Sequence, residues 1–171
     1  MVGLSVDPTQ TLLVLTSHTS NMITHKTHNI GSNGALTLIN STGNYASTVA
    51  PIKTVIKDMK IYAYVQGAPD TLHVTDLASG TSTTVTMNVS NYNITITPDR
   101  QKALIYHTNN SIANFYTLSP TFPYLGSYDP GISPGYEVLH YPSFSSDSQL
   151  VILEYDTFHS TVVLNLNDFS V

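Results

Sequence analysis

The chain has 171 residues, of which only 10% are charged, and its formal net charge is −5. Average globular proteins carry about 25% charged residues, and so acidic and weakly charged a chain is not expected to bind nucleic acid or an anionic membrane surface. The absence of cysteine excludes disulfides and cysteine-ligated metals, and no stretch reaches the roughly 18 apolar residues that a membrane-spanning helix needs.

One short cassette recurs four times along the chain: a strand, a turn containing Asp, and a second, apolar strand. The turns carry Asp7, Asp58, Asp99 and Asp147, at intervals of 41 to 51 residues. A period of roughly 40–50 residues built from short strands is typical of β-propellers, with one four-stranded blade in each repeat. We therefore predict an all-β fold in which residues 1–171 form a single propeller segment, with antiparallel blades at about 1–50, 51–90, 91–131 and 132–171.

The strands within each blade are placed by their apolar residues and by the turn residues between them. Residues 17–34 are expected to form a long loop in the first blade, and Pro142 weakens the first strand of the fourth blade, because proline cannot donate to a strand ladder. In chain order, the expected strands are 4–6, 11–17, 35–40 and 45–49, then 53–56, 61–66, 72–76 and 81–89, then 92–97, 103–107, 113–118 and 124–128, and finally 138–144, 150–155 and 161–166.

The fourth predicted blade has three strands, where the other blades have four. An unpaired strand edge is an aggregation hazard that proteins normally cover. We therefore expect these four blades to belong to a larger propeller of about six to eight blades; the alternative is an open array with an exposed edge. Further blades or another chain are expected to complete the propeller.

Two segments resemble known propeller repeats. Residues 94–99 read Ile-Thr-Ile-Thr-Pro-Asp and are followed at 102–111 by Lys-Ala-Leu-Ile-Tyr-His-Thr-Asn-Asn-Ser, which resembles a repeat of the Tyr-Val-Thr-Asn (YVTN) propeller family. Residues 144–147, Phe-Ser-Ser-Asp, with the strand at 150–153, are similar to that repeat and to WD-repeat blades, although the chain has no Trp. The resemblance implies a propeller fold without a particular activity, since propellers serve as lactonases, dehydrogenases and binding scaffolds.

Three histidines fall close together in the predicted loop of the first blade. His18, His25 and His28 have imidazoles that could bind Zn²⁺ or Cu²⁺ if they converged. The alternative is that they are exposed loop residues, because no acidic residue lies between Asp7 and Asp58 to complete a ligand set.

Two carboxylates end the apolar strand of the fourth blade. Glu154 and Asp156 are two residues apart and would share one face of a strand, close to His159. They could act as acid and base or hold Ca²⁺, or they could mark the point where the strand leaves the core for solvent. The four repeat Asp residues have a structural interpretation, in which their carboxylates accept hydrogen bonds from backbone N–H groups of the turn.

No motif of nucleophilic catalysis or of nucleotide binding is present. The sequence therefore favours a non-catalytic propeller segment that binds protein or glycan, with no cofactor. The alternative is the partial catalytic domain of a propeller enzyme of the lactonase or quinoprotein-dehydrogenase type. Because charge is low and Ser, Thr and Asn are abundant, we expect an extracellular or cell-surface location.

Overall fold

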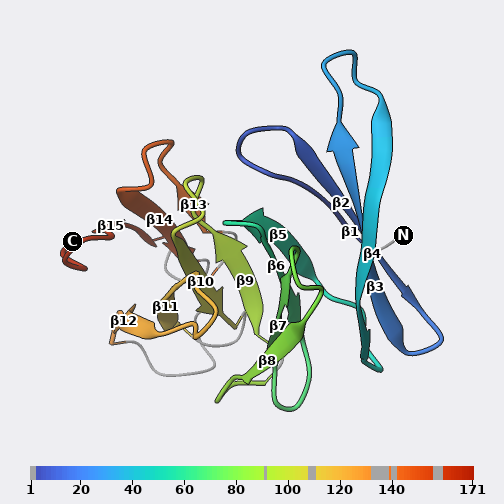
Figure 1. Cartoon of the computed structure of the whole chain (residues 1–171). Helices are drawn as coiled ribbons and strands as arrows, with labels where there is room; N and C mark the ends of the chain where they lie inside the picture. Colours follow the sequence, from blue (N-terminus) through green and yellow to red (C-terminus); the bar gives the residue numbers. More distant parts are fainter. Residues whose placement is uncertain (1–2, 91, 108–110, 132–138, 140–141, 156–159) are drawn as a thin grey trace. The chain divides into compact units, whose positions relative to one another are not determined.

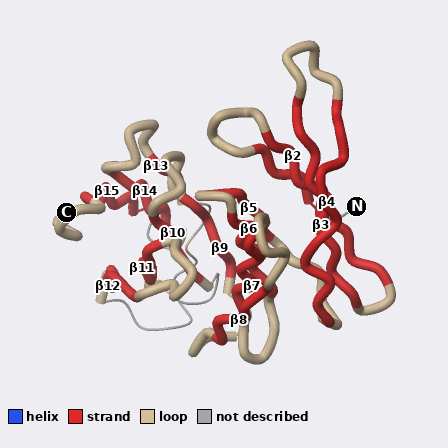
Figure 2. The backbone as a smooth tube through the Cα atoms, in the orientation of Figure 1, coloured by secondary structure: helices blue, strands red, loops and turns tan. Residues whose placement is uncertain are grey.

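The computed structural model describes residues 3–90, 92–107, 111–131, 139, 142–155 and 160–171. Within them every regular element is a β-strand (Figure 2), and fifteen strands form four antiparallel sheets in which each strand pairs with its neighbours in sequence. This meandering order is that of propeller blades, so the predicted fold class is confirmed. No helix in the described ranges is long and apolar enough to cross a membrane.

The chain divides into two compact units, Met1–Asn91 and Tyr92–Val171. The first unit holds two four-stranded sheets (Figure 1). Sheet A consists of β1 (Gly3–Val6), β2 (Leu12–Thr19), β3 (Met22–Ile30) and β4 (Leu36–Ala46), and sheet B consists of β5 (Lys53–Lys57), β6 (Lys60–Val65), β7 (Thr71–Asp76) and β8 (Ser82–Thr86).

A small aliphatic core joins the two sheets of this unit. Val14 on β2 packs with Ile56 on β5 and Ile61 on β6, and Leu77 and the partly buried Leu12 complete the cluster. Alternate residues of β2 thus face sheet B, and Leu13 and Leu15 lie on the opposite face of sheet A, because successive strand residues point to opposite sides.

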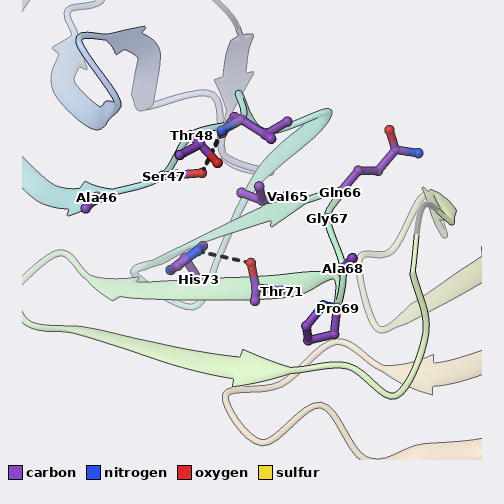
Figure 3. Close-up of a pocket in the computed structure, with 11 residues that line it drawn as sticks. Ala46, Ser47, Thr48, Val65, Gln66, Gly67, Ala68, Pro69, Thr71 and His73 are labelled. Atoms are coloured by element: carbon purple, nitrogen blue, oxygen red, sulfur yellow. Dashed lines mark hydrogen bonds between the residues drawn. The ribbon is translucent and has the colours of Figure 1, made fainter.

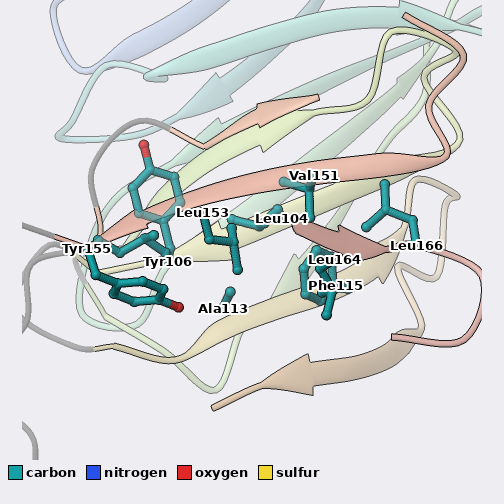
Figure 4. Packing of buried hydrophobic residues seen from close by; sticks show 10 residues of the cluster. Leu104, Tyr106, Ala113, Phe115, Val151, Leu153, Tyr155, Leu164 and Leu166 are labelled. Atoms are coloured by element: carbon teal, nitrogen blue, oxygen red, sulfur yellow. The ribbon is translucent and has the colours of Figure 1, made fainter. Parts of the chain in front are cut away.

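The second unit holds the other two sheets. Sheet C consists of β9 (Asn93–Ile96), β10 (Lys102–Tyr106), β11 (Ala113–Thr117) and β12 (Tyr124–Tyr128), and sheet D consists of β13 (Ser143–Phe144), β14 (Leu150–Tyr155) and β15 (Ser160–Asn165). Their shared core includes two aromatic rings from different sheets, Phe115 and Tyr155 (Figure 4). Full burial of one such side chain stabilises the fold by about 1.5–3 kcal/mol.

The second strands of sheets B and C, β6 and β10, show how sequence and burial correspond. In β6 and β10 every residue after the first is buried, which matches the near-continuous apolar runs in their sequences and indicates strands covered on both faces. The fourth strands, β8 and β12, are largely exposed, and β8 accordingly consists mostly of Ser and Thr.

The predicted loop at 17–34 was wrong, because most of it is strand. β3 (Met22–Ile30) occupies its centre, and the next strand is β4 (Leu36–Ala46), where two short strands were expected. Ser20 and Asn21 both have positive φ, 53° and 60°, as in the tight two-residue turns that join hairpin strands. The turn contains no glycine, and β3 alternates buried residues with Thr, His and Lys, so its polar composition was mistaken for that of a loop.

In the fourth sheet, the described part of the predicted first strand at 138–144 contains β13 (Ser143–Phe144) and an isolated bridge between Leu139 and Tyr155. Residues 138, 140 and 141 of that predicted strand lie outside the described residues. Pro142 directly precedes β13, consistent with its inability to donate a ladder hydrogen bond.

Three of the four repeat Asp residues organise their turns as predicted. Asp147 accepts hydrogen bonds from the hydroxyl of Ser145 (2.6 Å) and the backbone N–H of Gln149 (3.0 Å). Asp99 does the same with Thr97 (2.6 Å) and Gln101 (2.9 Å). The carboxylate of Asp7 likewise accepts bonds from backbone N–H groups of its own turn.

The remaining repeat residue, Asp58, does not accept backbone hydrogen bonds in its turn, which the structure describes in full, so its predicted structural role was wrong. It and Met59 have positive φ, 49° and 56°, so they form the two-residue turn between β5 and β6. Its exposed carboxylate lies 3.8 Å from the ammonium of Lys57, and no backbone N–H of the described residues donates to it. The turn at Asp58 is therefore set by backbone conformation.

Candidate functional site

A hollow of about 340 Å³ lies in the first unit, between the segment that follows β4 and the loop that joins β6 to β7 (Figure 3). Its lining comes from three parts of the chain. These are Ala46, Ser47, Thr48 and Val49 after sheet A, Val65, Gln66, Gly67, Ala68 and Pro69 at the β6–β7 loop, and Thr71 and His73 on β7.

The wall at Ser47 is fixed by the β2–β3 hairpin. The Ser47 N–H donates to the carbonyl of Asn21 (2.9 Å), and the Ser47 carbonyl lies 2.8 Å from Nε2 of His18. The Ser47 hydroxyl in turn donates to the carbonyl of Val49 (2.6 Å). His18 therefore acts as a positioning residue for this wall.

The opposite wall is held by Asp70, which is completely buried. Its carboxylate accepts hydrogen bonds from the hydroxyl of Tyr64 and the N–H of Gly67, each at 2.7 Å. Its own N–H donates to the carbonyl of Val89 (2.9 Å). A buried carboxylate is retained only where such partners satisfy it, and here the partners fix the loop at Gly67.

The inner part of the hollow is formed by His73 on β7. Both of its ring nitrogens are engaged, Nδ1 with the hydroxyl of Thr84 (2.9 Å) and Nε2 with that of Thr71 (3.2 Å), the latter shown in Figure 3. Burial lowers the pKa of His73 below its ordinary value of 6.5. The imidazole is therefore neutral at physiological pH, and both nitrogens already have a partner.

A second buried histidine, His25, lies on the neighbouring sheet. His25 on β3 is inaccessible to solvent, and its Nδ1 lies 2.9 Å from the hydroxyl of Thr16. Burial, with a smaller contribution from His73, lowers the pKa of His25 to about 4. Of the described residues that line the hollow none is charged, so the site offers hydroxyls, one amide side chain and aliphatic surface to a ligand.

The structure does not bring the three predicted histidines of the first blade together. His18 lies on β2, whereas His25 and His28 lie on β3, so all three are strand residues and their placement in a loop was wrong. His25 and His28 are three residues apart and face opposite sides of the sheet. Among the residues that the structure describes, no group of three His, Cys, Asp or Glu side chains is placed to hold a metal ion.

The predicted carboxylate pair is described only in part. Glu154 lies on β14, is exposed and is opposite Thr161 on β15. Asp156 and His159 lie outside the described residues. The proposed acid–base or Ca²⁺ role of this pair thus stays a prediction.

Sequence reasoning missed His73 and Asp70. One signal was available, because the Gly67-Ala68-Pro69-Asp70 segment has turn composition between two apolar strands. No signal linked that turn to Ser47, since the two meet only when sheet A packs beside sheet B.

Comparison with known proteins identifies the fold. No family model matches the sequence, and no curated protein matches it either. Among solved structures, the chain is similar to the C-terminal WD40 domain of Sif2 over 96% of its length, with a TM-score of 0.64 and 17% identity. It is also similar to the β-propeller domain of Myceliophteria thermophila Cps50 (Swd1), with 99% of the chain covered, a TM-score of 0.56 and 8% identity.

Hydrazine synthase of Kuenenia stuttgartiensis is a third similar structure, with 96% of the chain covered, a TM-score of 0.52 and 11% identity. At such identities the likeness concerns the fold, which is that of β-propeller blades. The chain spans 45% of the Sif2 domain, 71% of the Cps50 chain and 64% of the hydrazine synthase chain.

Proposed function

We propose that the chain is a non-catalytic β-propeller segment that binds an uncharged stretch of another protein in the hollow beside His73. The observation that carries the proposal is the hollow itself, with about 340 Å³ of space and, among the described residues, an uncharged lining. Its volume lies at the lower end of the range for ligand pockets, roughly 300–1,000 Å³. That space suits two or three side chains of an extended segment.

The lining favours a protein segment over a glycan. Val49, Val65 and Pro69 provide aliphatic surface, and the hydroxyls of Thr48 and Thr71 provide polar groups at the edges, an arrangement typical of sites that bind through apolar anchors and a few hydrogen bonds. Apart from the imidazole of His73, the described lining has no aromatic ring on which a sugar could stack. The net charge of −5 supports protein partners over nucleic acid.

The same geometry supports a non-catalytic role. A general base must lie within hydrogen-bond reach of the proton that it removes. His73 is the one titratable side chain of the described lining, and both of its ring nitrogens already engage threonine hydroxyls. The similarity to WD40 and Swd1 propeller domains and the resemblance of 94–111 to YVTN repeats agree with a scaffold. An extracellular or cell-surface location is part of this proposal and rests on composition alone.

The experiment is selection of a peptide display library on the 171-residue chain, with a glycan array run in parallel. Val49 is 43% exposed, so V49R places a charge at the hollow without disturbing the core. T83R, on the exposed β8 strand, is the matched control. We expect uncharged peptides to bind wild type and T83R equally and to lose at least about ten-fold in affinity on V49R. Peptides that bind V49R unchanged, or only a glycan that V49R abolishes, would contradict the proposal.

A further inference from the structure

The outer face of sheet D is aliphatic and is exposed to solvent at three of its described residues. Leu150 and Ile152 on β14 and Val163 on β15 are 37–47% exposed, and Ile152 is directly opposite Val163. The other face of the same strands, with Leu153 and Leu164, is buried in the core shared with sheet C. Antiparallel sheets with one solvated face normally place polar residues on that face, so an aliphatic outer face indicates that something covers it.

Comparison of β14 with β6 and β10, the second strands of sheets B and C, also indicates that the outer face of sheet D is covered by another surface. β6 and β10 are apolar on both faces and are buried on both. β14 has the same kind of sequence, Leu-Val-Ile-Leu-Glu-Tyr, but alternates exposed and buried residues. Its composition is thus that of a strand covered on both sides.

Sheet A has a second face of this kind. Leu4 on β1 and Leu36 and Leu38 on β4 are 52–58% exposed. Leu4 pairs with Leu15, which pairs with Lys26, so an exposed cation stands beside this aliphatic row. All of these residues lie on the face of sheet A opposite to the core shared with sheet B.

The charges on the two faces are complementary. The outer face of sheet D carries one described charge, the exposed carboxylate of Glu154 beside Ile152, and the outer face of sheet A carries Lys26. Two sheet D faces in contact would oppose Glu154 to Glu154, and two sheet A faces would oppose Lys26 to Lys26. Complementary charges select partners and orientation more than they add affinity. Here they favour packing of the sheet D face of one copy on the sheet A face of another.

We propose that the chain pairs with a second copy of itself, the outer face of sheet D in one copy packing on the outer face of sheet A in the other, with Glu154 next to Lys26 of the second copy. The contact is head to tail, and we place two of them in a closed pair, to which each copy contributes both faces. Two copies together carry about the length of the Sif2 WD40 domain, of which one chain spans 45%. The proposal does not depend on the binding hollow.

The test is the solution mass by light scattering on a size-exclusion column, from about 1 to 200 μM, with circular dichroism to confirm that each variant is folded. We expect wild type to be dimeric, and E154K and K26E each to raise the dissociation constant at least about ten-fold, because each places like charges together in both contacts. I152R, which puts a charge in the centre of the sheet D face, is expected to be monomeric. T83R, outside both faces, is expected to remain dimeric.

Mixing the two charge variants gives the sharpest result. In a mixed pair, the first contact joins position 154 of the E154K copy, now positive, to position 26 of the K26E copy, now negative. The second contact joins the native Glu154 of the K26E copy to the native Lys26 of the E154K copy. Both contacts then hold opposite charges, so the mixture should regain the wild-type mass. A monomeric wild type, an I152R variant that stays dimeric, or a mixture that fails to recover would overturn the proposal. If the wild type is monomeric, the two aliphatic faces would instead be covered by further blades of a longer chain.

Discussion

At the scale of single residues, two buried threonines on adjacent strands have opposite hydrogen-bonding states. The Thr16 hydroxyl is bonded to Nδ1 of His25, whereas the buried hydroxyl of Thr27 has no partner within the described residues. Leaving a buried polar group unsatisfied costs about 1–3 kcal/mol, and replacing it by an apolar group of the same shape removes that cost.

We therefore predict opposite effects for one isosteric change at the two sites. T27V should raise the free energy of unfolding by about 1 kcal/mol, and T16V should lower it by about 1–2 kcal/mol because it deprives His25 of its partner. Urea denaturation at pH 7.5 measures both values. Equal destabilisation by the two substitutions would show that the Thr27 hydroxyl is satisfied.

The buried histidines predict a specific pH dependence of stability. The pKa of His25 is about 4 in the folded chain against 6.5 as the ordinary value, so the unfolded chain binds a proton more readily between these two pH values. Since stability rises with pH wherever the unfolded state binds more protons, the contribution of His25 is fully present above pH 6.5. It is lost as the pH falls toward 4, in total about 3 kcal/mol.

Urea denaturation at pH 7.5, 6 and 5 tests this expectation. His73, whose pKa is also lowered by burial, titrates in the same direction and adds to the loss. H25Q keeps a polar side chain next to Thr16 and should show a clearly weaker fall in stability between pH 7.5 and 5. An H25Q variant with the slope of wild type would assign the pH dependence to other groups.

At the scale of elements, most strands were predictable from their apolar residues and the turns beside them, including the Ser- and Thr-rich β8, whereas β3 was mistaken for a loop. β6, β10 and β14 lie close to their expected positions, because each contains a run of consecutive aliphatic and aromatic residues that marks it as a strand. β3 was missed because its buried positions include His25 and Thr27. Those polar residues are accommodated by the neighbouring strand and sheet, whose positions a local pattern does not specify.

Turns that are fixed by local hydrogen bonds were predictable, whereas the hollow, which depends on tertiary packing, was not. Asp99 and Asp147 organise their turns by bonds within a few residues, so local sequence suffices to predict them. The bonds from the Ser145 hydroxyl and the Gln149 N–H also lower the pKa of Asp147. The hollow could not be predicted in this way, since Ser47 follows the last strand of sheet A and His73 lies in sheet B, so the two approach each other only through tertiary packing.

At the scale of the whole molecule, the two aliphatic outer faces determine how stability depends on concentration. If two copies cover these faces for each other, folding and association are linked, and dilution must destabilise the folded chain by mass action. For a pair of chains of this size the unfolding entropy implies a rise in Tm of about 2 °C for each ten-fold increase in concentration. A chain that folds as a monomer has a Tm independent of concentration.

We therefore predict a concentration-dependent Tm for wild type and a constant one for I152R, because the arginine prevents the faces from meeting without entering the core on the other side of β14. Differential scanning calorimetry at 5, 50 and 500 μM measures both, and a reversible transition on rescanning is required for the comparison. Parallel slopes for wild type and I152R would show that association, if it occurs, uses another surface. A slope confined to wild type would tie the stability of each copy to the faces that carry Glu154 and Lys26.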